Sequence, residues 1–320
     1  MAKYRLILKP LSPFQTPLHS DTLFGHICWA LRYLKGEEEL LKFLKAFNDT
    51  DAPFILSSGF PDGYLPMPVL RPLSIDEEET LQKTYKTELD FVREMKALKK
   101  VSYIPISVMA MLKNDLSYYN LYTKYRNKEI ILTAPEISKT DEVWHNTKNR
   151  LTNRVVIEGG LFAKEDTFFE KDAKFIVYIE DTYFGKKNLE ETFGFISRSG
   201  YGADKSVGRG MFNYDLQDEW GLPETENPNA FITLSHYHPK EGDFKDGFYD
   251  TVTKFGKIGG HWASGINGGP HKMPLLMLTP GSVFFTDSQK SFYGSLIPNI
   301  HKQQGVVHYG IALPLKVRVV

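Results

Sequence analysis

The sequence contains one cysteine, Cys28, among its 320 residues. A disulfide within the chain and a CxxC metal site both need at least two cysteines, so the sequence excludes both. Few cysteines are typical of a reducing compartment, and we expect a cytoplasmic protein. The first residues, Met1-Ala2-Lys3-Tyr4-Arg5, lead into no signal-peptide pattern, and no apolar run approaches the length of a membrane span. We therefore expect no membrane attachment.

An excess of charge of either sign is also lacking. Lysine and arginine number 39, as do aspartate and glutamate, so the net charge gives no indication of a nucleic-acid partner. The charges are nevertheless segregated along the chain. Acidic residues crowd residues 37–39, 76–79 and 215–226, whereas residues 145–154 and 251–286 contain basic residues and no carboxylate. Any surface that binds nucleic acid must therefore come from such local basic segments.

A regular alternation of strands and helices is absent as well. The length and the 42% hydrophobic content favour two domains, each able to bury a core. Strand and helix signals are mixed in each half, without the spacing of a doubly wound βαβ fold. These signals predict an α+β architecture with antiparallel sheets. The acidic residues 215–229 contain two prolines and are predicted to be a linker between the halves.

One helix is predicted with clear ends. It follows a strand at residues 4–9, with Ser20 or Asp21 as the capping residue, one apolar face, and Gly36 as its end. A long charged helix is predicted within residues 75–99, with Leu81, Tyr85, Leu89 and Val92 as its inner stripe. Further strands are predicted at residues 154–157, 174–179, 210–214, 231–236, 275–278, 282–285 and 311–320, and further helices at residues 38–47 and 189–197.

A glycine-rich loop is the strongest functional signal. Residues 199–210 read Ser-Gly-Tyr-Gly-Ala-Asp-Lys-Ser-Val-Gly-Arg-Gly, and glycine lets backbone N–H groups converge on an anion. A nucleotide P-loop is excluded because Asp204 precedes Lys205, and a dinucleotide fingerprint is excluded because Lys205 stands where its third glycine belongs. The remaining interpretations are a cationic clamp for a phosphodiester chain or an ordinary solvated surface loop.

A second basic segment lies in the middle of the chain. Binding of single-stranded RNA needs spaced cations for phosphates, together with aromatic or amide groups for splayed bases. Residues 145–154 supply this set with His145, Asn146, Lys148, Arg150 and Arg154. The alternative is a solvated hairpin with an ordinary share of charge. Residues 256–272, which contain six glycines, Lys257, His261 and Lys272, are either a further RNA-facing or subunit-facing loop or a flexible connection.

Four motifs in a fixed order carry a resemblance to a known family. They are TPLHSDTLFG at residues 16–25, HNTKNRLT at residues 145–152, EGGLF at residues 158–162, and the glycine-rich loop at residues 200–210. This ordered set covers essentially the whole chain and resembles the RAMP proteins of CRISPR interference complexes. More narrowly, it is similar to the foot subunit (the Cas-five group) of type III-A Csm complexes.

That resemblance implies two ferredoxin-like, RRM-related domains at residues 1–217 and 229–320, with a thumb hairpin inserted at about residues 145–166. It also implies a scaffold without catalytic residues, metal or cofactor. Such a subunit holds the repeat-derived 5′ tag of a guide RNA and joins the large polymerase-like subunit to a backbone RAMP subunit. Carried onto this chain, the clamp is residues 200–210, with Lys205 and Arg209 on phosphates. The full set of expected RNA-binding residues is His19, Ser20, His145, Asn146, Lys148, Arg150, Arg154, Arg198, Gly200, Tyr201, Gly202, Lys205, Ser206, Gly208, Arg209 and Gly210.

A metal-independent ribonuclease is the alternative function, with His19 or His145 as general base, because some relatives in other CRISPR types process RNA. Neighbours on one strand-to-helix turn, such as His19-Ser20-Asp21, do not easily form a catalytic triad, since that geometry needs groups from separate segments. Helix capping is the favoured role of Ser20 or Asp21. His236 and His238, expected on one face of a strand, lack a third metal ligand in the sequence.

Overall fold

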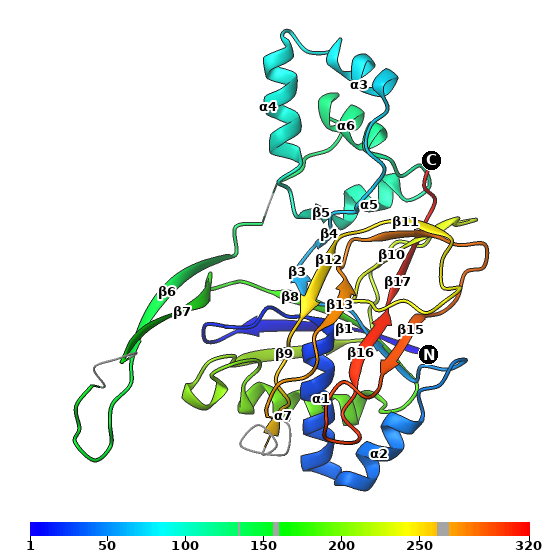
Figure 1. Cartoon of the computed structure of the whole chain (residues 1–320). Coiled ribbons are helices and arrows are strands. Elements are labelled where there is room, and N and C mark those ends of the chain that lie inside the picture. Colours follow the sequence, from blue (N-terminus) through cyan, green and yellow to red (C-terminus); the bar gives the residue numbers. More distant parts are fainter. Residues whose placement is uncertain (134, 156–159, 261–268) are drawn as a thin grey trace.

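The computed structural model describes residues 1–133, 135–155, 160–260 and 269–320. Within these residues, every pairing between the strands named below is antiparallel. The strands form several separate sheets, and most of the helices lie in the first two thirds of the chain (Figure 1). The predicted mixed α+β class with antiparallel sheets is confirmed.

The largest sheet belongs to the N-terminal half. Its strands lie in the order β2 (Phe54–Leu56), β8 (Phe175–Asp181), β1 (Ala2–Pro10) and β9 (Phe212–Gln217), and β3 (Phe60–Pro61) also pairs with β8. Strands β1 and β8 lie in the middle and carry long runs of buried apolar side chains, which explains why both were visible in the sequence. The predicted strand at 210–214 extends further, to Gln217, so the first three residues of the predicted linker belong to β9 instead.

Helix α1 (Ser20–Lys35) is the predicted N-terminal helix. Leu23, Ile27 and Leu31 recur every four residues and are buried, and the helix ends at Gly36, whose φ is 96°. The predicted side-chain cap is wrong. His19 is the N-cap residue, and no side chain caps the helix, because the side chains of Ser20 and Asp21 bond to other segments described below.

Two other helices accompany α1. Helix α2 (Glu37–Lys45) follows it directly, and α7 (Lys186–Ser199), which contains the predicted helix at 189–197, packs beside it. An ion pair of 2.7 Å between Lys35 and Glu191 joins α1 and α7. Helix α7 ends at Gly200, so this packing places the glycine-rich loop next to α1.

A helical lobe is inserted between β3 and β8. Strands β4 (Tyr64–Pro66) and β5 (Tyr103–Pro105) pair at its base, and it consists of α3 (Ile75–Gln82), α4 (Glu88–Leu98), α5 (Ile106–Leu112) and α6 (Tyr118–Arg126) (Figure 1). The predicted single helix at 75–99 is wrong. The chain breaks between α3 and α4, where the Thr87 side chain accepts a hydrogen bond from Asp90 N and starts a new helix. The break resets the helical phase, so Phe91, Met95 and Leu98 are buried, while the predicted Leu89 and Val92 are exposed.

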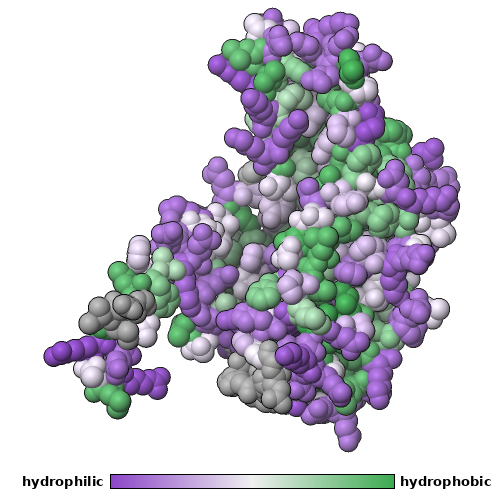
Figure 2. Space-filling view, viewed as in Figure 1, coloured by the Kyte–Doolittle hydropathy of each residue, from purple (hydrophilic) through white to green (hydrophobic). Residues whose placement is uncertain are grey.

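A long hairpin projects from the body below this lobe (Figure 1). It consists of β6 (Ser138–Asn146) and β7 (Leu161–Phe169), paired along their whole length. Phe14 exchanges backbone hydrogen bonds of 3.0 and 2.8 Å with Thr167 and so fixes the base of the hairpin to the body. The predicted thumb at 145–166 lies within this hairpin, whose strands begin earlier and end later. Figure 2 shows mainly hydrophilic side chains at its far end. Arg154 and Val155 lie in no named strand, and the rest of the strand predicted at 154–157 lies outside the described residues.

After α7, the described residues contain one short 3-10 helix (Lys205–Val207) and otherwise only strands and turns. One sheet has the order β11 (Asp246–Phe248), β14 (Val283–Phe285), β10 (Ala230–Thr233) and β17 (Pro314–Val317). Two further pairs are β12 (Thr251–Lys254) with β13 (Leu275–Leu278), and β15 (Tyr293–Ile297) with β16 (His308–Ala312). The strand predicted at 231–236 ends at Thr233, so His236 and His238 lie beyond it. Among the described residues, no helix is both long and apolar enough to cross a membrane.

Candidate nucleic-acid interface

The glycine-rich loop runs from the end of α7 to the start of β9 as a series of tight turns. Gly200, Gly202, Asp204, Gly208 and Gly210 all have a positive φ. At Gly210 a Cβ atom would lie 1.9 Å from the carbonyl oxygen of Tyr201. Only glycine fits there, because any Cβ would overlap the backbone on the other side of the loop.

Tyr201 anchors this loop to the body. Its side chain is completely buried, and its hydroxyl donates to the Pro17 carbonyl at 2.6 Å and accepts from His19 N at 3.2 Å. Gly202 N donates to His26 Nε2 at 2.9 Å. Burial, with a smaller contribution from Lys205, lowers the pKa of His26 to about 3, so the ring is neutral and accepts this hydrogen bond. Tyr201 and His26 therefore hold the loop from inside.

Several backbone N–H groups that we expected to bind phosphate are used within the protein. Tyr201 N donates to the Gly210 carbonyl, Gly208 N to Lys205 O, and Gly210 N to Pro13 O. These three N–H groups are therefore not free to bind an anion, and the loop offers mainly side chains for such a contact.

The two expected cations of the loop differ in their surroundings. Arg209 Nη2 lies 2.5 Å from Oδ2 of Asp166 on β7, a carboxylate that is completely buried. Lys164, also on β7, pairs with Asp204, and this hydrogen bond lowers the pKa of Asp204. Two ion pairs thus join the loop to the base of the hairpin. The charge of Arg209 is already balanced by an internal carboxylate.

Lys205 is the cation of this loop without such a partner. Among the described residues, neither an ion pair nor a hydrogen-bond acceptor is found for its ammonium group, and desolvation lowers its pKa. Ser206 and Gly208 are exposed beside it, and Arg198 is exposed in the last turn of α7. The exposed side of the loop is therefore basic, with Lys205 at its centre.

The hairpin carries the second basic group. Asn146, Lys148, Arg150 and Arg154 are exposed at or beyond the end of β6, and the described residues provide no ion pair for the three cations. His145 is half-buried on β6 and stacks on Phe162 of β7, with ring centroids 5.5 Å apart. Because β7 also holds Lys164 and Asp166, one strand connects the basic tip to the glycine-rich loop.

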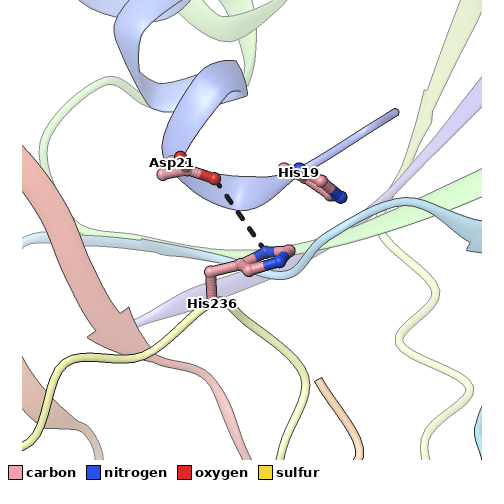
Figure 3. Close-up of side chains that lie close together, drawn as sticks. All are labelled: His19, Asp21 and His236. Carbon is pink, nitrogen blue, oxygen red and sulfur yellow. Dashed lines mark ion pairs between the residues drawn. The ribbon is translucent and has the colours of Figure 1, made fainter. Parts of the chain in front are cut away.

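His19 and Asp21 belong to a buried cluster that the sequence did not predict. Asp21 points from the start of α1 toward His236, which follows β10 in the other half of the chain (Figure 3). Lys254 Nζ from β12 lies 3.1 Å from Asp21 Oδ1 and 2.6 Å from His19 Nδ1. His308 Nε2 from β16 lies 3.4 Å from Asp21 Oδ2. The cluster therefore collects groups from four separate segments.

Ser20 joins the same two halves. It is completely buried, and its Oγ accepts a hydrogen bond from His236 N at 2.9 Å, while its own N–H donates to Ser58 Oγ at 3.1 Å. Ser58 Oγ lies 3.2 Å from His236 Nδ1. In this conformation Ser20 has no exposed surface with which to contact RNA, and its place is in the junction between the halves.

The cluster contains one ion pair, between Asp21 and Lys254, surrounded by the neutral imidazole rings of His19, His236 and His308. Burial alone would raise the pKa of Asp21, but Lys254, with smaller contributions from the histidines, outweighs burial and lowers this pKa. Burial also lowers the pKa of His19 to about 4, of His236 to about 2 and of His308 to about 4. At neutral pH the three imidazoles are therefore neutral and Asp21 is ionised. Its ion-pair partner is Lys254, whose pKa is lowered by burial against the opposing charge of Asp21.

This arrangement does not resemble an active site. His19, Asp21 and His236 each offer one ligand atom, and these atoms lie within 4.8 Å of one another. However, Lys254 Nζ lies within hydrogen-bond distance of two of them, so a metal ion could bind only if this ammonium group moved away. The same contact engages His19 Nδ1, which weakens the case for His19 as the base of a ribonuclease.

The histidine pKa shifts predict an acid-sensitive fold. The histidines have an ordinary pKa of about 6.5 when unfolded, and in the folded chain that of His308 is lowered to about 4. A group whose pKa is lower in the folded than in the unfolded protein contributes its full stabilisation at pH values above the pKa of the unfolded state. This contribution is lost as the pH falls toward the pKa of the folded state. We expect the free energy of unfolding, measured in urea, to decrease as the pH falls from about 6.5 to 4.

Two histidine variants test this prediction. His308→Gln should make the pH dependence of the free energy of unfolding shallower, whereas His271→Gln, at an exposed site, should not. A stability that rises over this interval would contradict the prediction.

Lys254 and His308 are the residues of this cluster that sequence reasoning missed, and His236 was considered only with His238 as a metal-binding pair. Each of the three cluster residues lies more than 200 positions from Asp21. The only signal was the absence of carboxylates from residues 251–286, which left Lys254 without a local partner.

Comparison with known proteins decides the fold. No family model matches the chain, and no curated protein is significantly similar to it. A solved structure of a Csm1-Csm4 cassette in complex with cA4 contains a chain that matches with a TM-score of 0.59 at 16% identity, over 99% of both chains. A Csm3-Csm4 subcomplex of the type III-A CRISPR-Cas interference complex matches with a TM-score of 0.57 at 17% identity, over 98% of both chains. Csm4 is the component that these structures have in common.

The chain has the fold of Csm4. A second Csm1-Csm4 cassette, bound to AMPPNP, agrees, with a TM-score of 0.56 at 18% identity over 99% of both chains. The resemblance to the type III-A foot subunit, inferred from the order of four motifs, is thereby confirmed at the level of the Csm4 fold. The match extends over both halves of the chain.

Proposed function

We propose that this chain is a non-catalytic RNA-binding scaffold subunit of a type III-A CRISPR interference complex. In this role it holds the repeat-derived 5′ tag of the guide RNA and bridges the large polymerase-like subunit to a backbone RAMP subunit in the cytoplasm. The single observation that carries the proposal is the match over nearly the whole chain to Csm4, which in the matching structures is complexed with Csm1 or with Csm3.

We assign two domains, at residues 1–217 and 229–320, and the strand order supports a ferredoxin-like fold for the first. In the first, the elements follow the chain as β1, α1, β2, β8, α7 and β9, and the strands lie in the order β2, β8, β1, β9. This is the βαββαβ arrangement of a ferredoxin-like domain, with the helical lobe and the thumb hairpin both inserted between its second and third strands. The second domain is assigned a ferredoxin-like fold by the resemblance alone.

We assign RNA contacts to accessible basic and polar groups at the loop and on the hairpin. At the loop they are Arg198 in the last turn of α7, Lys205, Ser206 and Gly208, and on the hairpin they are the half-buried His145 and the exposed Asn146, Lys148, Arg150 and Arg154. Gly200, Tyr201, Gly202 and Gly210 shape the loop, and Arg209 fixes it to β7. Exposed cations bind phosphates without reading sequence, whereas the amide and ring groups of the hairpin can contact bases.

Isolation of the protein from its native cells tests the proposed function. We expect mass spectrometry to identify other CRISPR subunits, and sequencing to identify RNAs that share one repeat-derived 5′ end. Recovery of the protein alone, without RNA, would contradict the proposal.

Lys205 and Asp204 provide a matched pair of substitutions with opposite expected effects. Lys205→Ala removes a cation without an internal partner, so RNA affinity should fall and the slope of log affinity against log salt should decrease by about 0.7. Asp204→Asn frees Lys164 from its ion pair and keeps a residue type that tolerates the positive φ, so affinity should rise. Filter binding of single-stranded RNA over a salt series measures both. Equal affinities for both variants and the parent would exclude the loop as a phosphate contact.

A further inference from the structure

The two halves of the chain enclose a cavity of about 600 Å³ beside the glycine-rich loop. Helices α1 and α2 form one wall, and residues 256–260, Lys272 and residues 303–309 form the other, while Gly202 and Lys205 lie at its edge. This volume lies in the range of small-ligand sites. The cavity adjoins the exposed face of the loop, with which it shares Lys205, and no hairpin residue is among its described lining residues.

Among the described residues, three lysines that line this cavity, Lys205, Lys257 and Lys272, have no carboxylate partner, and Lys257 is exposed. Lys272 Nζ is partly buried and donates to the Val307 carbonyl at 3.1 Å, and desolvation lowers its pKa. An ammonium group has three N–H donors, and the described residues provide no other acceptor for Lys272 and none for Lys205. Desolvated cations with free donors favour an anionic ligand.

The two carboxylates of the described lining are each paired with another cation, although the charge of Asp21 also partly offsets the lowering of the Lys272 pKa by burial. Asp21 is paired with Lys254 at 3.1 Å, and Glu37 is paired with Arg32 at 2.8 Å. The cavity therefore has a net positive lining at Lys205 and Lys272.

The remaining wall suits a flat, partly apolar group. Apolar side chains from α1, α2 and the C-terminal half line it, and Gln303 and Gln304 offer amide groups that can donate and accept hydrogen bonds. The apolar residues include Phe24, Leu40, Leu44, Ile258 and Val306. A nucleotide requires this combination: cations bind its phosphate, an apolar wall packs against its base, and amide groups bond to the polar edge of the base.

We propose that this cavity binds a single nucleoside phosphate unit, with its phosphate on Lys205 and Lys272 and its base against the apolar wall. The unit is either a free mononucleotide or one nucleotide of a bound RNA strand. The second source rests on the proposed function, since it requires that the chain holds RNA. Both sources share the same chemistry and the same lysines.

Titration of the full chain with AMP tests the site, with adenosine as the ligand that lacks the phosphate. We expect AMP to bind at least about tenfold more tightly than adenosine, a difference of about 1.4 kcal/mol. Lys272→Met and Lys205→Ala should each weaken AMP binding, Lys272→Arg should retain most of it, and Lys83→Ala, which removes a distant exposed cation, should leave it unchanged. Lys205 is exposed, so its variant tests the site even if the Lys272 variant folds poorly.

A short single-stranded RNA separates the two sources. If the RNA displaces AMP competitively, a nucleotide of the strand occupies the cavity, and if both bind together, the ligand is a free mononucleotide. Absence of AMP binding by the folded chain, combined with RNA binding that is unchanged in Lys272→Met, would overturn the inference and leave the RNA-scaffold function standing. Absence of any RNA binding together with intact AMP binding would instead contradict the scaffold function.

Discussion

Asp21→Asn should destabilise the folded chain by about 3–5 kcal/mol, because it leaves the Lys254 ammonium buried without its counter-ion. The side chains of Asp21 and Lys254 are only 6% and 12% exposed, so solvent cannot replace the lost charge. The asparagine would also lie among three imidazoles that are neutral at pH 7. Urea denaturation at neutral pH measures the loss as a shift of the midpoint.

A double variant provides the control for this prediction. Asp21→Asn combined with Lys254→Met removes both charges, and we expect it to be more stable than Asp21→Asn alone. If the free energy of unfolding of Asp21→Asn lies within about 1 kcal/mol of that of the parent, the loss is no larger than that for an exposed ion pair. Such a result would show that the Asp21–Lys254 pair is solvated. The cluster would then not hold the two halves together electrostatically.

Gly210→Ala is the second substitution with a large expected effect. Its Cβ would lie 1.9 Å from Tyr201 O and 2.5 Å from Tyr201 N, in a residue with a φ of 74°. Tyr201 would have to move, although its buried ring and hydroxyl hold the loop to Pro17 and His19. We expect a stability loss of several kcal/mol and a marked loss of RNA affinity, read by thermal unfolding and filter binding.

Gly208 supplies the matched control in the same loop. Its φ is 86°, but a Cβ there meets nothing within 4 Å. Gly208→Ala should therefore cost only the backbone strain, about 1–2 kcal/mol. Equal effects at the two positions would mean that the close approach to Tyr201 does not shape the loop.

Local patterns in the sequence predicted much of the fold. The apolar spacing of α1 and the glycine that ends it were sufficient to place this helix, and β1 and β8 were visible as buried runs. The helix expected at 75–99 failed because a cap at Thr87 resets the helical phase. A periodicity averaged over the whole segment does not detect such a break.

The candidate site was predicted less completely, because its partners are distant in sequence. Arg209 was read as a phosphate contact from its place in a basic loop, but it pairs with Asp166, a residue on another strand. Similarly, the sequence places His19 and Asp21 beside Ser20 on one strand-to-helix turn and gives no sign of their distant partners. Their actual partners, Lys254 and His236, come from the other half of the chain.

The ion pairs that join Arg209 to Asp166 and Lys164 to Asp204 have a consequence for protein engineering. Grafting the hairpin alone onto a relative would bury the Asp166 carboxylate without its cation, and grafting the loop alone would leave Arg209 without its anion. A chimera that exchanges either segment must therefore exchange both. The hairpin and the glycine-rich loop must therefore be exchanged together, although 40 positions separate Lys164 from Asp204.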